Sequence, residues 1–361
     1  MTLSLLGSPG RPDVGPTRDT GLDQRFAAIV DELTRRGLLA GALGTAALAG
    51  LPACGGSDPA PARGGGSWSF TDDLGRTVRL DRAPRRIVAL NDLLAATLWS
   101  QGLHTIVGAP LYTGNAYILD AGGVSAAERA RMTPVSGTAG PDPEKVAKAA
   151  PDLMVTIADS VENSLVTAIP ALAKIAPWIG INAQSAGFEA IMASGARLLG
   201  ALDVEEADLS AKADYDTQAA RLRSALAAKP GLRIGFVFTA DANGIELMGA
   251  EQWPCLLTLG GLGANLAKIS GSDPYFQQVS WENVADLPLD LVVYTEGEGG
   301  QPDVRQRPWN QPTWQWMPAI KNGQYLNSGQ NWYVYNYATF AGLLRDLADA
   351  VGKAVPGIGP R

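Results

Sequence analysis

Short apolar runs alternate with amphipathic stretches along most of the chain from Trp68 onward. Apolar runs of about four to eight residues are typical of buried strands, and the stretches between them have helical spacing. The alternation predicts an α/β fold in which helices cover parallel sheets. The expected strands are 87–90, 105–108, 153–157, 178–181, 233–238, 289–294 and 324–327. The expected helices include 93–101, 142–150, 164–173 and 340–351, and a hairpin is expected over 69–80.

One segment differs because its helical spacing continues beyond the length of an ordinary helix. Residues 187–228 contain no proline, and leucines recur along them. We expect a single long helix here, dividing the chain into two α/β halves. The predicted parts are an amino-terminal α/β lobe at 68–183, an interlobe helix at 184–229 and a carboxyl-terminal α/β lobe at 230–361.

The beginning of the chain has the features of a bacterial export signal with a lipid attachment site. Arg35 and Arg36 precede an apolar run of 14 residues, 38–51, which matches a twin-arginine signal. The run is shorter than the roughly 20 residues that a membrane-spanning helix needs. It ends in Leu-Pro-Ala-Cys, which looks like a lipobox whose Cys54 carries the lipid. The alternative is a buried helix, rich in Ala and Gly, with a chance cysteine.

This interpretation gives a twin-arginine lipoprotein signal peptide at 1–53 and a flexible tether at 54–67 that is rich in Gly, Ser and Pro. Residues 1–33 either extend the charged region of the signal unusually far or precede the true start. The mature protein is expected to begin at Cys54 and to be anchored by its lipid at the extracytoplasmic face of the cell membrane.

Charge and residue usage exclude several classes of function. The 361 residues include 29 basic and 36 acidic side chains, and the net charge of −7 disfavours binding to nucleic acid. Two cysteines cannot form a disulfide framework, and one histidine gives no zinc-ligand spacing. No nucleophile–base pair or metal-binding constellation is visible, so we expect neither an enzyme nor a covalent cofactor. His104 is expected to be structural, and Cys255 to be a buried thiol.

Four motifs follow one another between residues 68 and 351. The first joins FTDDLGRTV at 70–78 to APRRIVAL at 83–90. The second, DPEKV followed by APDLMV, covers 142–155, and the third, VSWENV followed by PLDLVV, repeats this unit at 279–293. The fourth is AIKNGQ at 319–324. Together they resemble the helix-backbone class of substrate-binding lipoproteins that serve ABC importers of iron–siderophores, haem and vitamin B12.

The resemblance implies two Rossmann-like lobes joined by a single long interdomain helix, a monomeric state, and an ABC transporter permease as partner. In this family one glutamate of each lobe pairs with arginines of the permease, and the matching residues here are Glu144 and Glu282. Both lie near the start of a helix, where the helix dipole favours a carboxylate, so a capping role is the simpler alternative. The two roles are compatible, and the equivalent placement in both lobes favours docking.

The ligand of such a fold lies between the lobes, where loops at strand ends meet it. Candidate ligand-binding residues in these loops are Tyr112, Tyr117, Thr138, Asp159, Asn243, Arg305, Arg307, Trp309, Trp314 and Trp332. The loop 294–316 brings arginines close to tryptophans in the sequence, and cations beside flat apolar faces suit a ferric siderophore. The alternative is that the tryptophans pack under the loop while the arginines face solvent.

We therefore expect an extracytoplasmic solute-binding lipoprotein that captures a ferric siderophore and delivers it to an ABC import permease. Haem or cobalamin is the alternative ligand, and Tyr112, Tyr117 or Tyr333 is then a candidate ligand of haem iron. An exported protein with no role in transport is the alternative from a different class.

Overall fold

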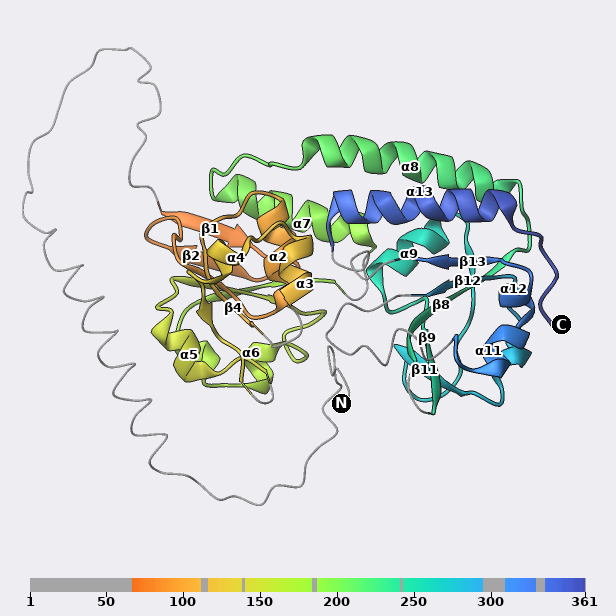
Figure 1. Ribbon diagram of the computed structural model, residues 1–361. Coiled ribbons are helices and arrows are strands. Elements are labelled where there is room, and N and C mark those ends of the chain that lie inside the picture. Colours follow the sequence, from red (N-terminus) through yellow and green to blue (C-terminus); the bar gives the residue numbers. More distant parts are fainter. Residues whose placement is uncertain are drawn as a thin grey trace, which may run out of the picture. The chain divides into compact units, whose positions relative to one another are not determined.

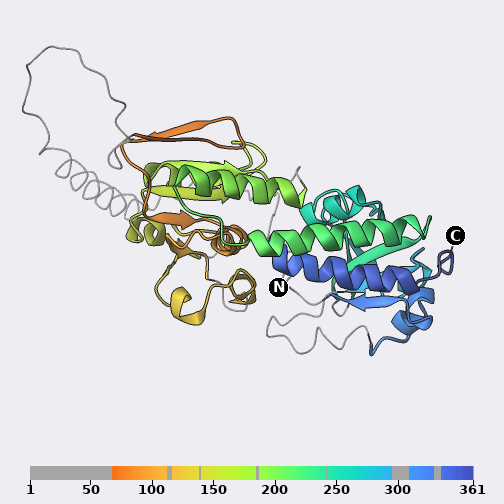
Figure 2. The same cartoon turned by 90° about the horizontal axis from the view of Figure 1, so that it is seen from above.

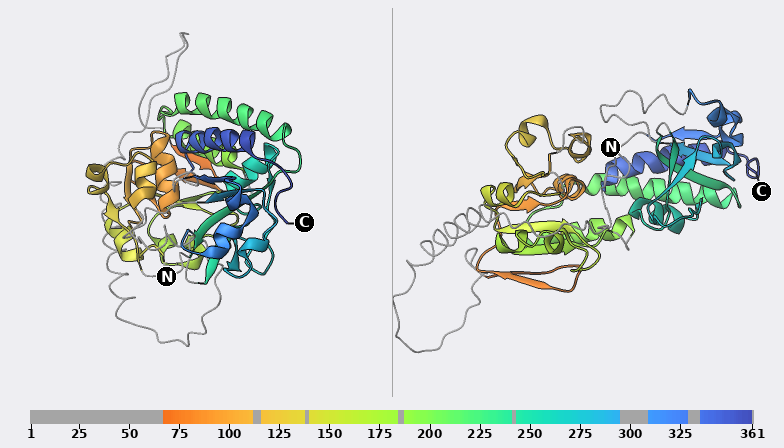
Figure 3. Two further views of the ribbon diagram at one scale, coloured as in Figure 1. Left: turned by 45° about the vertical axis from the view of Figure 1, so that its right-hand side comes forward. Right: turned by 90° about the horizontal axis from the view of Figure 1, so that it is seen from below.

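The computed structural model (Figure 1) describes residues 67–111, 116–137, 140–183, 187–240, 243–294, 309–328 and 335–360. Within these ranges the strands form two larger sheets, and the elements that belong to each sheet gather in a separate group (Figure 3). We call the group around the first sheet the first lobe and the group around the second sheet the second lobe. The expected two-lobed α/β fold is confirmed.

The first lobe is built on a parallel sheet with the strand order β5-β4-β3-β6-β7. All five residues of β6 are buried, as expected for a strand covered on both faces. The strands are β3 (Ile87–Ala89), β4 (Ile106–Ala109), β5 (Thr133–Pro134), β6 (Leu153–Ile157) and β7 (Trp178–Ile181). The helices are α2 (Asp92–Ser100), α3 (Ala116–Ala121), α4 (Ala126–Arg129), α5 (Pro143–Lys148), α6 (Leu165–Ala168) and the 3-10 helix η1 (Leu172–Lys174). The expected hairpin consists of β1 (Trp68–Thr71) and β2 (Thr77–Leu80).

The second lobe is built on a sheet with the strand order β11-β9-β8-β12-β13, and β10 pairs with β8. Its strands are β8 (Arg233–Ala240), β9 (Gly244–Met248), β10 (Asn265–Leu266), β11 (Phe276–Ser280), β12 (Leu291–Tyr294) and β13 (Tyr325–Asn327). Its helices are α9 (Pro254–Gly261), η2 (Val284–Asp286), α11 (Pro312–Trp316), α12 (Pro318–Lys321) and α13 (Tyr337–Lys353). Because β9 runs antiparallel to β8 and to β11, this sheet is mixed and differs from the parallel layer expected.

The segment expected as one long interlobe helix contains two helices, α7 (Phe188–Ala201) and α8 (Leu209–Ala227), so a single linking helix is not confirmed. Asp203 has a φ of 58°, and the N–H of Val204 donates to the Leu199 carbonyl at 3.0 Å. This is the hydrogen bond of a Schellman motif, which ends a helix at a left-handed residue. Glycine usually occupies that position, so an aspartate there leaves the helix end invisible in the sequence.

Of these two helices, α7 contacts both lobes. At its start Phe188 packs against Phe340 of α13, with ring centroids 4.7 Å apart, and the Phe188 N–H donates to the Thr258 hydroxyl of α9 at 3.0 Å. At its end the Ala201 carbonyl accepts a hydrogen bond from Trp68 Nε1 of β1 at 2.7 Å. The 14-residue helix α7 is therefore one of the elements that link the lobes.

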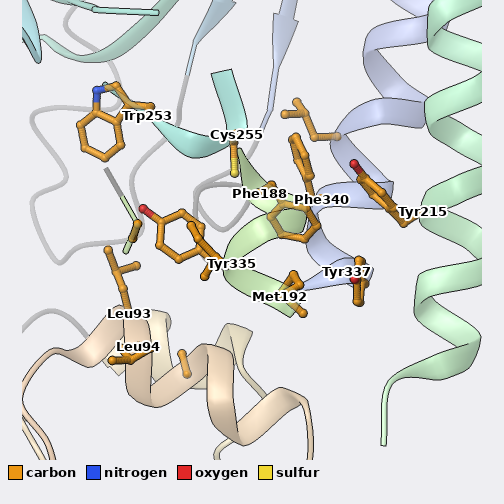
Figure 4. Packing of buried hydrophobic residues seen from close by; sticks show 14 of the residues in the cluster. Leu93, Leu94, Phe188, Met192, Tyr215, Trp253, Cys255, Tyr335, Tyr337 and Phe340 are labelled. Carbon is orange, nitrogen blue, oxygen red and sulfur yellow. The ribbon is translucent and has the colours of Figure 1, made fainter. Parts of the chain in front are cut away.

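The other helix, α8, lies beside α13 in both Figure 1 and Figure 2. The ring of Tyr215 in α8 lies 5.4 Å from that of Tyr337 and 5.8 Å from that of Phe340, both in α13. Figure 4 shows the apolar cluster continuing through Tyr335 towards Leu93 of α2. One apolar core thus extends from the first lobe into the second.

A buried or half-buried aspartate fixes the start of the central strands in each lobe. In the first lobe the Asp152 carboxylate accepts hydrogen bonds from the N–H groups of Arg85 and Arg86, at 2.9 and 2.8 Å, just before β3. In the second lobe the Asp290 carboxylate accepts from the N–H of Arg233 at 3.0 Å and from its guanidinium at 2.9 Å. Asp152 and Asp290 also precede equivalent strands, β6 and β12. The two lobes therefore share one local arrangement.

Burial and hydrogen bonding act in opposite directions on Asp290, which is 0% exposed. Burial alone raises the pKa of its carboxyl, but hydrogen bonds from Arg233 and from the N–H of Gly359 bring that pKa well below its usual range. A lowered pKa in the folded state means that the ionised carboxylate stabilises the fold above about pH 4 and loses this effect as the pH falls.

We predict that Asp290→Ala lowers the free energy of unfolding by about 3 kcal/mol at pH 7, because it leaves a guanidinium and backbone N–H groups without their acceptor. Asp152→Ala is the matched control, and a loss of about 1 kcal/mol is expected because its site is partly open to water. Urea unfolding followed by circular dichroism measures both, and the difference between Asp290→Ala and the native chain should shrink at pH 3. Equal losses for the two variants contradict this account.

Candidate functional site

The sequence predicts ligand-binding residues in the segments that follow the carboxyl ends of the strands in the two sheets. Strands β3, β4 and β6 are mutually parallel, as are β8 and β12, so within each lobe their carboxyl ends meet at one edge. In open α/β folds the loops at this edge form the ligand site. Five of the predicted residues lie in described segments that follow such strands: Tyr117, Asp159, Asn243, Trp309 and Trp314.

The predicted residues that lie outside the described ranges are Tyr112, Thr138, Arg305, Arg307, Trp332, Tyr333, Arg35, Arg36 and Cys54. Their assigned roles stay predictions from the sequence.

Asp159 follows the carboxyl end of β6 with a half-buried side chain. Its Oδ2 accepts a hydrogen bond from the Asn163 amide at 3.3 Å. Its Oδ1 is buried and accepts no hydrogen bond from the described residues. A carboxylate oxygen with neither water nor a donor is costly, so this atom has an unused capacity to accept a hydrogen bond.

Three aromatic residues of the second lobe, Trp253, Tyr275 and Tyr335, form a group that we call the aromatic wall. Trp253 Nε1 donates to the Tyr275 carbonyl at 3.3 Å, and their ring centroids are 6.1 Å apart. Figure 4 shows Tyr335 between Trp253 and Leu93 of α2, which belongs to the first lobe. Burial raises the pKa of Tyr275, and the charges of Asp159 and Asp273 raise it further. The charge of Asp159 in the first lobe thus acts on the Tyr275 phenol of the second.

A second aromatic group follows β12. The ring of Trp309 lies 5.1 Å from that of Tyr325 and 5.9 Å from that of Tyr294. Trp309 is half-buried, whereas its neighbour Trp314 is 0% exposed in the core of the second lobe. A fully buried indole presents no surface to a ligand, so Trp314 fits the alternative in which the tryptophans pack under the loop. Trp309 stays a candidate ligand-binding residue.

Tyr117 and Asn243 differ in exposure. Tyr117 of α3 is half-buried and packs against the large apolar core. Asn243 is exposed in the turn between β8 and β9, and its carbonyl accepts a hydrogen bond from the N–H of Trp281 at 3.3 Å. This bond places Asn243 next to the turn that carries Glu282.

The two predicted docking glutamates occupy equivalent places. Glu144 lies in the first turn of α5, which follows β5, and Glu282 lies in the turn that follows β11. β5 and β11 are the outer strands at corresponding ends of the two strand orders. Both glutamates are exposed, and the α5 cap belongs to Asp142, whose Oδ1 accepts from the Glu144 N–H at 2.9 Å. The carboxylate of Glu144 is therefore not the side chain that caps its helix.

His104 and Cys255 have structural surroundings. His104 is exposed in the turn before β4, and its ring centroid lies 4.6 Å from that of Trp99. Cys255 is buried in α9, where burial and the charge of Glu189 raise the pKa of its thiol. Both positions agree with the roles expected from the sequence. Among the described residues, no three His, Cys, Asp or Glu side chains are grouped to hold a metal ion.

Comparison with known families decides which class of protein this is. Residues 88–328, from β3 in the first sheet through β13 in the second, match the family model described as periplasmic binding protein. The chain belongs to the periplasmic binding protein family. Membership makes this periplasmic binding protein a solute-binding protein rather than an enzyme, and it implies a place outside the cytoplasm.

Several solved structures are similar to this periplasmic binding protein. The ferric-siderophore receptor protein DesE from Streptomyces coelicolor is 26% identical with a TM-score of 0.65, and the similarity covers 80% of this chain and 99% of DesE. The petrobactin-binding protein YclQ from Bacillus subtilis is 17% identical with a TM-score of 0.59, over 80% and 99% of the two chains. The iron uptake ABC transporter substrate-binding protein PiuA from Streptococcus pneumoniae is 18% identical with a TM-score of 0.58, over 80% and 98%.

The likeness to YclQ and PiuA concerns the fold. A search of curated proteins finds no match to this periplasmic binding protein. Across the described ranges, none of the helices has the length and apolar character needed to cross a bilayer.

Sequence reasoning missed Tyr275 and Trp253 as residues of the candidate site. A local signal existed, because Asp273-Pro274 is a turn dipeptide. In the structure Asp273 Oδ1 accepts hydrogen bonds from the N–H groups of Tyr275 and Phe276, at 2.8 and 3.2 Å, which fixes where Tyr275 leaves the turn. The sequence does not show that this turn faces Asp159, more than 100 positions away.

Proposed function

We propose that this periplasmic binding protein captures a ferric siderophore outside the cytoplasm and delivers it to the permease of an ABC importer. The observation that carries the proposal is the likeness to a ferric-siderophore receptor protein over 80% of this chain and 99% of that one, at 26% identity. A further structure with the same fold holds two molecules of acinetobactin with ferric iron; it is 16% identical, with a TM-score of 0.58.

The candidate site fits the chemistry of such a ligand. A ferric siderophore presents a broad organic shell around a metal whose coordination is already complete, so the protein needs aromatic surface and hydrogen-bonding groups rather than metal ligands. Trp309, Tyr117 and Tyr275 are half-buried and supply such surface, and Asp159 and Asn243 supply polar groups. Arg305 and Arg307 are proposed to meet anionic groups of the complex.

Delivery to a permease is the second part of the proposal. Glu144 and Glu282 are exposed, and each follows the outer strand at the corresponding end of its sheet. Two carboxylates on separate lobes offer a permease two points for charge pairing, which favours one docking orientation. The protein is proposed to act as a monomer, since each lobe supplies one of the two points.

Membrane attachment is the third part. Arg35 and Arg36 are proposed to direct twin-arginine export, and the lipid on Cys54 then holds the protein at the membrane. The tether at 54–67 keeps the binding protein near its permease and raises its effective concentration there.

The ligand proposal predicts quenching of intrinsic tryptophan fluorescence when a ferric tris-hydroxamate or a ferric tris-catecholate is added. Trp309→Phe should weaken binding about fivefold, because Trp309 is partly accessible at the edge of the site. Trp314→Phe is the matched control: affinity should stay within about twofold while the free energy of unfolding falls by about 1–3 kcal/mol. Haem is titrated in parallel, and a Soret shift with no response to either iron complex contradicts the proposed ligand.

The docking proposal predicts that Glu144→Arg with Glu282→Arg lowers uptake of radioactive ferric siderophore in cells at least about tenfold, since like charges then face the permease. Ligand affinity of the purified variant should not change. The control is Glu205→Arg with Glu251→Arg, which makes the same charge change at exposed positions that follow α7 and β9. Uptake that is equally low in both double variants, or normal in both, contradicts docking through Glu144 and Glu282.

The anchoring proposal predicts that Cys54→Ser moves the protein from the membrane fraction to the soluble extracytoplasmic fraction. Replacing Arg35 and Arg36 by Lys should instead keep the protein in the cytoplasm. Cell fractionation followed by immunoblotting measures both outcomes. A Cys54→Ser protein that stays in the membrane fraction contradicts the lipid anchor.

A further inference from the structure

Trp316, the last residue of α11, has the most exposed large apolar side chain among the described residues, with 65% of its surface open to solvent. Side chains two positions apart in a helix point to roughly opposite sides. Trp314 takes the inner side and is fully buried, so Trp316 faces solvent on the outer side. Single apolar side chains are common on protein surfaces, so the neighbours of Trp316 decide whether it marks an interface.

The neighbours of Trp316 include the turn that carries Glu282. Helix α11 lies against η2, where Cα atoms of the two elements come within 8 Å of each other. Trp314 of α11 and Val284 of η2 are buried in the same apolar cluster. Glu282 is exposed and lies two residues before Val284. The exposed side chains of Trp316 and Glu282 therefore belong to adjoining segments of the second lobe.

These adjoining segments are acidic and aromatic. Asp286 of η2 is exposed like Glu282, and neither forms an ion pair with another described residue. The segments 276–288 and 309–316 contain no Lys or Arg. Carboxylates beside an exposed indole suit a guanidinium, because this planar group stacks on an aromatic face while its N–H groups donate to carboxylates. The segments therefore fit a partner that presents arginine.

The energetics of docking favour the permease as that partner. Ion pairs between exposed side chains contribute little to binding, so two exposed glutamates alone make a weak docking surface. Covering an apolar side chain contributes more, and tryptophan and arginine are enriched among the residues that dominate interfaces. Figure 1 shows α11, and also α5 with Glu144, on the side away from α8 and α13. Trp316 therefore extends the surface already proposed to meet the permease.

We infer that Trp316 is a docking residue that, together with Glu282, binds an arginine side chain of the ABC permease, with the indole covering the guanidinium. The inference rests on the proposed docking through Glu144 and Glu282, and it adds an apolar contact to the charge pairing. Within the described part of the first lobe no large apolar side chain is exposed. The second lobe should therefore contribute more of the docking affinity than the first.

The first test measures uptake of a radioactive ferric tris-hydroxamate or tris-catecholate by cells whose only copy of this chain is a variant. Trp316→Ala should lower uptake at least about fivefold, while the purified variant keeps its ligand affinity within about twofold. Trp316→Phe keeps an aromatic face and should retain at least about half of the uptake. Leu209→Ala is the matched control: Leu209 is 61% exposed in α8, away from α11 in Figure 1, and uptake should not change.

The second test identifies the molecule that contacts Trp316. The photoreactive residue p-benzoylphenylalanine is placed at position 316 or, as a control, at position 209, and the cells are irradiated during uptake. Mass spectrometry of the cross-linked product should identify a permease subunit of an ABC importer for position 316 alone, with the cross-link close to an arginine. Both positions are exposed, so neither replacement is expected to unfold the protein.

Four results overturn the inference: normal uptake with Trp316→Ala, an equal loss of uptake with Leu209→Ala, a loss of ligand affinity that explains the loss of uptake, or a cross-link from position 316 to a second copy of this chain and none to a permease. Each of these leaves docking through Glu144 and Glu282 standing. Normal uptake with Glu144→Arg and Glu282→Arg contradicts the docking proposal itself, and failure of the native chain to bind either iron complex contradicts the proposed ligand.

Discussion

Parallel pairing of β3 with β6 and of β8 with β12 is the constraint on which the site depends. Strands that pair in parallel run the same way, so the residues that follow them leave the sheet at one edge. Asp152 and Asp290 hold the other edge by accepting hydrogen bonds from backbone N–H groups at the strand starts. Fixed strand starts also fix the positions of the carboxyl ends. Asp159 lies two residues after the carboxyl end of β6.

The contacts around α7 then determine how the carboxyl edge of the first sheet lies relative to that of the second. The Glu189 carboxylate accepts hydrogen bonds from the Tyr215 hydroxyl of α8 and from the Thr258 hydroxyl of α9, the latter at 2.9 Å. Burial, followed by the hydrogen bond to Glu189, keeps the pKa of Tyr215 far above its usual value, which favours the protonated phenol as the donor. With Phe188 packed on Phe340 beside these bonds, we expect small movements between the lobes rather than a wide hinge motion.

Most of the fold could be predicted from the sequence because buried strands such as β6 and β12 are largely apolar runs. β9 and β11 could not, since Gly244–Met248 is interrupted by Glu246 and Phe276–Ser280 contains two glutamines. The break between α7 and α8 depends on the left-handed Asp203, which no glycine marks.

The site could be predicted only in part for similar reasons. Asp159 was recognisable because it directly follows a buried strand, whereas Tyr275 depends on a turn from a distant part of the chain. Sequence spacing also does not separate Trp309 from Trp314, because packing against η2 and the second sheet decides which ring is buried.

The central claim is that a ferric siderophore lies between the carboxyl-terminal edges of the two sheets. The most direct measurement is iron anomalous scattering from crystals grown with a bound ferric siderophore. The account predicts one iron peak between the lobes, with the segments after β6 and β12 on opposite sides of the complex. An iron peak beside α8 and α13, or on the outer surface of a single lobe, would contradict it.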